Sequence, residues 1–138
     1  MKKTVLIFLG LALWLPSWAQ QDTHETTQMQ RLVKEHDDIM AKDMGEMGRL
    51  IGQLQDLSRT NGPHENYQKA IDELKTANKA MVDWMHGFGA RFDGDEMYKG
   101  KALTDQKKVW LNEEEIKFFE MKEQLKSSIK AAESLVAE

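Results

Sequence analysis

The chain has 138 residues, of which 30% are charged, with 19 basic and 23 acidic side chains and no cysteine. This length favours a single domain, and the lack of cysteine excludes a disulfide framework, so stability must come from packing. The net charge of −4 disfavours binding to nucleic acid or to an anionic membrane surface, because both carry negative charge themselves.

Residues 1–19 have the three parts of a secretory signal peptide. Two lysines precede an apolar run over residues 5–15, which is shorter than the roughly 20 residues that a membrane-spanning helix needs. The small residues that follow predict cleavage after Ala19, which leaves 20–138 as one mature domain. We therefore expect a periplasmic or secreted protein with no transmembrane span, and with no lipid anchor because the cleavage site lacks cysteine.

Three stretches of the mature chain are rich in helix-forming residues, and their apolar positions recur at helical spacing. The first predicted helix covers residues 25–59, and Gly62 and Pro63 terminate it. The second covers residues 64–87. The third starts after Thr104, which is a suitable N-cap. No stretch alternates in the manner of a β-strand.

These elements predict an all-α fold, an elongated up-down-up three-helix bundle of coiled-coil character. The tight turn at Gly62 makes the first two helices antiparallel. Residues equally distant from the turn should then face each other, which places His36 opposite Phe88. The connection over residues 87–103 is long, and ordered connections of this length are often functional. An exposed helix face would also allow a homodimer.

A row of histidine and methionine side chains on the first helix has the chemistry of a soft-metal site. Thioether and imidazole groups select Cu(I) or Ag(I), and an exported protein without thiols would have to use them. The antiparallel turn brings two more methionines to the same level. The candidate metal ligands are His36, Met40, Met44, Met81 and Met85. Methionine also fills irregular gaps between helices, and we favour this simpler explanation of the row as core packing.

The end of the bundle that carries the long connection also collects most of the aromatic side chains of the mature chain. The candidate ligand-binding residues are Trp84, Phe88, Phe92, Tyr98 and Trp110. Surfaces rich in methionine can repack around varied partners. We therefore expect this end to bind a partner protein or a small ligand.

No catalytic constellation is recognisable in the sequence, and we expect no enzyme. There is no Ser-His-Asp or Cys-His pattern and no glycine loop that would cradle a phosphate. The DGDE motif at residues 93–96 has its glycine in the wrong place for an EF-hand, so it predicts a turn with an acidic surface. The NEEE run at residues 112–115 is interpreted as solvated acidic residues near the start of the third helix.

Three segments carry a resemblance to a known family: HDDIMAKDMGEMGRLIGQL, AIDELKTANKAMVDWMHGFGARFDGDE and WLNEEEIKFFEMKEQLKSSIKAAESL. Together they resemble small exported or lipid-anchored helical proteins of unknown function from Bacteroidota, some of which bear the automated name "viral A-type inclusion protein". The segment AMVDWMHGFGARFD is the most distinctive. The resemblance implies an envelope location and carries over no activity and no binding residues. Members with a lipobox cysteine differ from this chain, which has Trp18-Ala19-Gln20 at that place.

The expected function is therefore non-catalytic. We expect a periplasmic helical protein that binds an unknown envelope protein or a small ligand at its methionine-rich and aromatic end, without a cofactor. One alternative is the binding or storage of Cu(I) or Ag(I). Another is an envelope chaperone or structural spacer that acts through long amphipathic surfaces.

Overall fold

The computed structural model describes residues 18–62 and 64–137, with side chains from His24 onward. The predicted signal peptide lies outside these residues, apart from the backbone of its last two. Helices cover most of the described ranges and no strand occurs in them, which confirms the all-α prediction. The helices are α1 (Trp18–Asn61), α2 (Glu65–Arg91), α3 (Gly94–Tyr98) and α4 (Asp105–Val136). None of these described helices is both long and apolar enough to cross a membrane.

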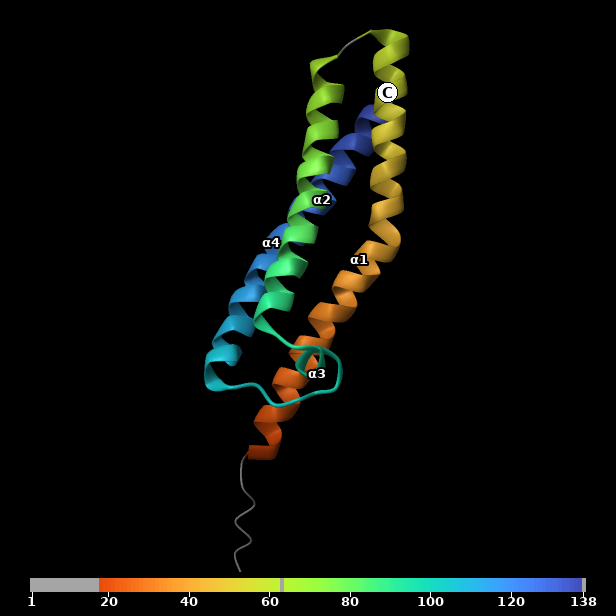
Figure 1. Cartoon of the computed structure of the whole chain (residues 1–138). Helices are drawn as coiled ribbons and strands as arrows, with labels where there is room; N and C mark the ends of the chain where they lie inside the picture. The colour runs from red at the N-terminus through yellow and green to blue at the C-terminus, as the bar shows by residue number, and fades with distance from the viewer. Residues whose placement is uncertain (1–17, 63, 138) are drawn as a thin grey trace, which may run out of the picture.

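The arrangement of the three long helices follows from the turn at Gly62. This glycine has a φ of 89°, a left-handed conformation that glycine adopts without steric cost, and α1 and α2 run antiparallel on either side of it (Figure 1). α4 starts beside the lower part of α2 and crosses toward the upper half of α1. α2 and α4 form the most extensive pair of helices in the described chain.

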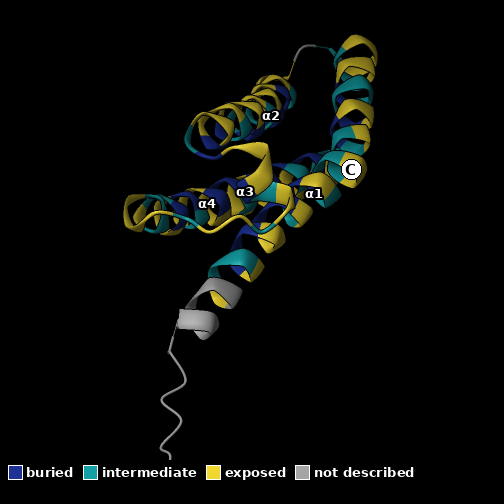
Figure 2. Cartoon of the chain, turned by 60° about the horizontal axis from the view of Figure 1, so that its bottom comes forward, coloured by how far each residue is buried: buried dark blue, intermediate teal, exposed yellow. Residues whose placement is uncertain are grey.

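A single apolar core runs between the long helices, whose facing sides carry the buried residues (Figure 2). Each large apolar side chain buried there contributes about 1.5–3 kcal/mol to stability. The fully buried members include Leu32, Leu50 and Leu54 of α1, Leu74, Met81 and Phe88 of α2, and Leu111, Phe118 and Leu125 of α4. With no cysteine in the chain, this core carries the stability of the fold.

Polar side chains align the first half of α1 with α4. The Gln28 amide donates hydrogen bonds to the Glu115 carboxylate at 2.6 Å and to the Asn112 side chain at 3.1 Å. Seven residues further along each helix, Lys122 donates a hydrogen bond to Glu35 at 2.7 Å. Partly exposed polar contacts of this kind add little stability. They favour one alignment of α1 against α4, because a shift along the helix axis would break them together.

α2 is longer than predicted, because it continues through Gly87 and Gly89 to Arg91. The prediction that the helix ends at residue 87 was therefore wrong. Each glycine costs a helix about 1 kcal/mol relative to alanine. Extending the helix buries Phe88 and supports the burial of Phe92, and each of these gains about 1.5–3 kcal/mol. Burial therefore outweighs the poor helix propensity of the two glycines.

The connection after α2 contains the unpredicted helix α3, which packs against the lower part of α1 (Figure 1). Asp93 and Glu96 form a capping box: the Asp93 carboxylate accepts from the Glu96 amide at 3.0 Å, and the Glu96 carboxylate accepts from the Asp93 amide at 2.8 Å. Glu96 is buried and also binds the Lys107 ammonium at 2.6 Å. The DGDE motif is therefore the start of a helix that Lys107 ties to α4.

The start of α4 agrees with the sequence prediction. The Thr104 hydroxyl accepts a hydrogen bond from the Lys107 amide at 3.3 Å and so caps the helix. A capping oxygen satisfies an amide that has no partner within its own helix. Lys107 therefore takes part in two contacts: its amide completes the cap of α4, and its ammonium binds Glu96 of α3.

The cap of α3 makes a pH-dependent contribution that can be tested. The hydrogen bond from Lys101, at 2.6 Å, holds the pKa of Asp93 below its ordinary value of 3.8, and backbone hydrogen bonds lower this pKa further. A carboxyl whose pKa is lowered by folding stabilises the fold above its ordinary pKa, and this contribution is lost as pH falls through the folded value. We expect Lys101→Met to raise the pKa of Asp93, as measured by NMR titration of its side-chain carboxyl carbon.

Lys99→Met is the matched control, because Lys99 pairs with Asp95 and not with Asp93. It should leave the Asp93 titration unchanged. Equal shifts in the two variants would contradict the assigned cause.

Candidate functional site

Trp84 lies at the centre of an aromatic cluster between α2 and α4. Its ring stacks on Phe88 with centroids 4.7 Å apart and tilts against Phe118 at 4.9 Å. Phe88 in turn contacts Phe92 at 4.8 Å. Trp84, Phe88 and the C-cap residue Phe92 follow one another at intervals of four residues, so they lie on the same side of α2. Aromatic contacts at these distances are favourable beyond the area they bury, by about 0.5–1.5 kcal/mol each.

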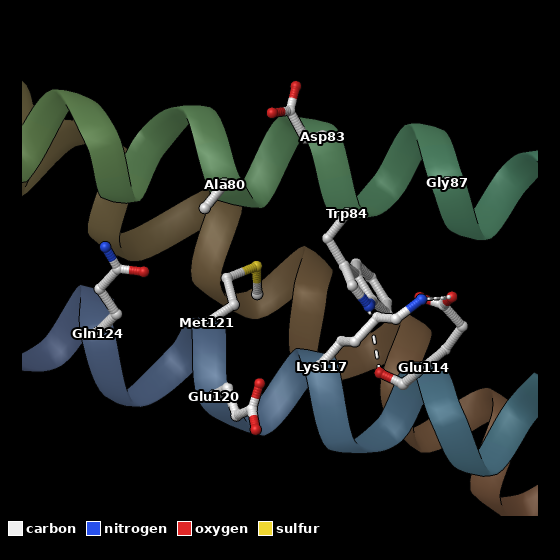
Figure 3. A pocket seen from close by; sticks show the side chains of 9 residues that line it. All are labelled: Ala80, Asp83, Trp84, Gly87, Glu114, Lys117, Glu120, Met121 and Gln124. Carbon is white, nitrogen blue, oxygen red and sulfur yellow. Dashed lines mark hydrogen bonds and ion pairs between the residues drawn. The ribbon is translucent and has the colours of Figure 1, made fainter.

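A groove between α2 and α4 exposes the edge of this cluster. It has a volume of about 450 Å³, and Figure 3 shows it from the solvent side. The lining residues are Ala80, Asp83, Trp84 and Gly87 of α2 and Glu114, Lys117, Glu120, Met121 and Gln124 of α4. Trp84 is only 7% exposed and forms part of the floor. Ala80 and Gly87 lie one turn to either side of it, and their small size leaves the room for the groove.

Glu114 places a carboxylate at the end of this groove. The residue is only 3% exposed, and its Oε1 accepts a hydrogen bond from the Lys117 ammonium at 2.8 Å. The Arg91 guanidinium, which comes from α2, lies 3.1 Å from the same oxygen. The backbone carbonyl of Glu114 accepts the indole N–H of Trp84 at 3.2 Å. One residue of α4 thus fixes both the tryptophan and two cations.

The other candidate ligand-binding residues do not line the groove. Phe88 and Phe92 are buried in the core. Tyr98 is 59% exposed but belongs to α3. Trp110 is half-buried, with the Arg91 guanidinium 5.3 Å from its ring centroid. Of the five candidates, the structure brings Trp84, Phe88 and Phe92 into one cluster, and only Trp84 reaches the groove.

The candidate metal ligands lie around the same part of the core. His36 is 6% exposed, and its ring lies 5.6 Å from Trp84 rather than at the predicted Phe88. α1 changes direction near the middle of its length (Figure 1), so equal distance from the turn does not mean equal height. The Nδ1 atom of His36 is 3.4 Å from an Asp37 carboxylate oxygen. Met81 is fully buried, and Met40, Met44 and Met85 pack against the core in partly buried positions.

Oxygen and nitrogen ligands do not add to this row. Within the part of the chain that the structure describes, no three or more His, Asp or Glu side chains gather closely enough to hold a metal ion. A metal at His36 would therefore depend on the thioethers of the methionine row.

Glu114, Lys117 and Arg91 are not among the site residues predicted from the sequence. The NEEE run was interpreted as solvated, and for Glu114 that interpretation was wrong, since this residue is buried. A signal for its burial exists in the sequence: Glu114 lies three residues after Leu111 and four before Phe118, on the apolar face of its helix. A charged residue at such a position requires a partner, because an unpaired buried charge is costly.

Comparisons with known proteins found no similar protein. No family model matches the chain, no curated protein matches it, and no solved structure matches its fold. The resemblance to the Bacteroidota family stays a prediction from sequence.

The two ion pairs of Glu114 should contribute to the free energy of unfolding. Arg91→Met or Lys117→Met alone should cost at most about 1 kcal/mol of unfolding free energy, because both cations are partly exposed and the other one remains. The double variant leaves a buried carboxylate without a cation and should cost about 3–5 kcal/mol. Urea unfolding measures these values.

The control is to add Glu114→Gln to the double variant, which should restore its stability. It removes the charge but keeps the shape, so most of the lost stability should return. A double variant whose loss equals the sum of the two single losses would show that Arg91 and Lys117 do not share Glu114.

Proposed function

We propose that this protein is a non-catalytic, exported helical protein that binds an apolar group of a small ligand or partner in the groove at Trp84. The observation that carries the proposal is the groove of about 450 Å³ with a tryptophan in its floor. Sites for small molecules have volumes of roughly 300–1,000 Å³ and are mostly apolar with a few polar groups. The floor of Trp84 and Met121 and the polar end at Glu114 agree with that pattern.

A binding role accounts for these residues better than catalysis does. The single buried carboxylate of the groove is engaged by Lys117 and Arg91, which leaves it poorly suited to act as a general base. Neither a hydroxyl nor a thiol nucleophile lines the groove. In this proposal the three long helices form the predicted bundle, and α3 attaches the connection to α1.

The proposed location rests on the signal peptide predicted for residues 1–19 and on the resemblance to exported helical proteins. We therefore propose that the groove faces the periplasm or the extracellular medium. The partner or ligand would then be an envelope protein or a small molecule of that compartment.

Filling the groove should weaken the binding of an apolar probe. We expect n-hexanol to shift the NMR signal of the Trp84 indole N–H, and we expect Gly87→Leu to weaken this binding about tenfold, or 1.4 kcal/mol. The added side chain would enter the groove that Gly87 lines.

Gly89→Leu is the control for this test. Gly89 is also an exposed glycine of α2 with open space where a side chain would start, but it does not line the groove. It should leave binding unchanged. A wild-type protein with no response to n-hexanol, or equal losses in the two variants, would count against the groove as the binding site.

Soft-metal binding is the second candidate. It is supported by the burial of His36 beside Trp84 and by Met40, Met44 and Met85, which pack against the core in partly buried positions. Imidazole and thioether groups suit Cu(I) and Ag(I). A spacer role has less support, because the exposed large apolar side chains of the described residues are confined to the half of the bundle near the connection. These side chains are Val82, Tyr98, Val109, Ile116 and Phe119.

Thermal unfolding with Cu(I) tests the second candidate. If the row binds Cu(I), a concentration of 100 times the dissociation constant should stabilise the fold by about 2.7 kcal/mol. Met40→Leu/Met85→Leu should lose this stabilisation, whereas Met97→Leu, outside the row, should keep it. A wild-type melting temperature that Cu(I) and Ag(I) leave unchanged would exclude this candidate.

A further inference from the structure

We infer that the groove at Trp84 binds a small organic cation, a primary ammonium on an aliphatic stem, whose place is taken in this structure by the side chain of Lys117. The inference rests on the proposed function and names the class of ligand. In Figure 3, the Lys117 side chain runs along the groove to the Glu114 carboxylate, past the ring of Trp84 in this view. The Lys117 side chain, a primary ammonium on an aliphatic stem, thus has the chemistry of the proposed ligand.

One oxygen of the Glu114 carboxylate is available to bind a ligand. Oε1 receives Lys117 and Arg91, whereas Oε2 accepts no hydrogen bond from any described residue. Glu114 lines the groove while the residue as a whole is nearly buried. A charged group in such a partly desolvated position attracts a cation more strongly than an exposed carboxylate does.

Of the two cations at Glu114, Lys117 is the one that a ligand can replace. Lys117 lies three residues along the same helix and its side chain is 53% exposed, so its ion pair contributes little to the fold. Arg91 is held by additional contacts, to Glu113 at 2.7 Å and over the ring of Trp110. Arg91 therefore stays in place while Lys117 moves into solvent.

The geometry favours an ammonium over other cations. A guanidinium binds a carboxylate best through both oxygens, but Arg91 already lies at Oε1. An ammonium is a compact donor that can use one free oxygen. Metal ions such as Ca²⁺ need six or more oxygen ligands, and one carboxylate does not supply them.

The walls of the groove suit an aliphatic stem and disfavour anions. Trp84 and Met121 supply an apolar floor, and Ala80 and Gly87 leave space above it. The exposed Glu120 has no ion-pair partner among the described residues, and three of the four charged lining residues are acidic. The volume fits a small molecule, so we assign the cation to a free alkylamine rather than to a helix of another protein.

The test compares n-hexylammonium with n-hexanol, which has a similar stem and no charge, by NMR titration of the Trp84 indole N–H in the folded protein. In Lys117→Ala, which vacates the site, we expect n-hexylammonium to bind at least about tenfold more tightly than n-hexanol. In the wild type this preference should be smaller, because Lys117 competes for Glu114.

Glu114→Gln in the Lys117→Ala background should remove the preference for the ammonium, whereas Glu120→Gln should keep it. Thermal unfolding verifies that each variant is folded; if Glu114→Gln is not, the comparison of Lys117→Ala with the wild type decides. Equal binding of the two probes in Lys117→Ala would overturn the ammonium assignment and leave the groove as a binding site. Failure of both probes in both proteins would overturn the proposed function as well.

The source of the ammonium is tested by N-acetyl-lysine N-methylamide, which presents the same group on a peptide backbone. Weaker binding than n-hexylammonium supports a free amine as the ligand. Tighter binding would overturn that choice in favour of a lysine side chain of a partner protein.

Discussion

The burial of the Glu114 carboxylate between α2 and α4 is the constraint on which the rest of this structure depends. A carboxylate that is almost wholly removed from water must be paired, and Arg91 supplies a cation from the opposite helix. Arg91 reaches Glu114 because α2 remains helical to this residue, past two glycines. The carbonyl of the same glutamate holds the Trp84 indole, so the alignment of α2 with α4 and the position of the groove have one origin.

α1 closes the opposite side of this interface. His36 lies behind Trp84, and the side chains of Gln28 and Glu35 align α1 with α4. The capping box of α3 and the pair between Glu96 and Lys107 hold the connection against the lower end of α1. The aromatic cluster is thereby enclosed from three directions, and the groove over Trp84 is where it approaches solvent between α2 and α4.

Much of the fold could be predicted from local chemistry. Gly62 terminates α1 and Thr104 caps α4, because a left-handed glycine and a capping hydroxyl act within a few residues of the chain. The end of α2 could not be predicted in this way, because it depends on the burial of Phe88 against Trp84 and other core residues. α3 was missed because a helix of five residues has too few positions to show a period.

The same distinction between local and tertiary determinants applies to the candidate site. The sequence by itself determined the all-α class, the concentration of aromatic and methionine residues near the connection, and Trp84 as a candidate, because periodicity and composition are properties of single segments. Only the tertiary structure decided that Phe88 belongs to the core, that Trp84 borders a groove, and that Glu114 is buried between two cations. These outcomes depend on which helix faces meet, and the free energy of burying a side chain is set by neighbours distant in sequence.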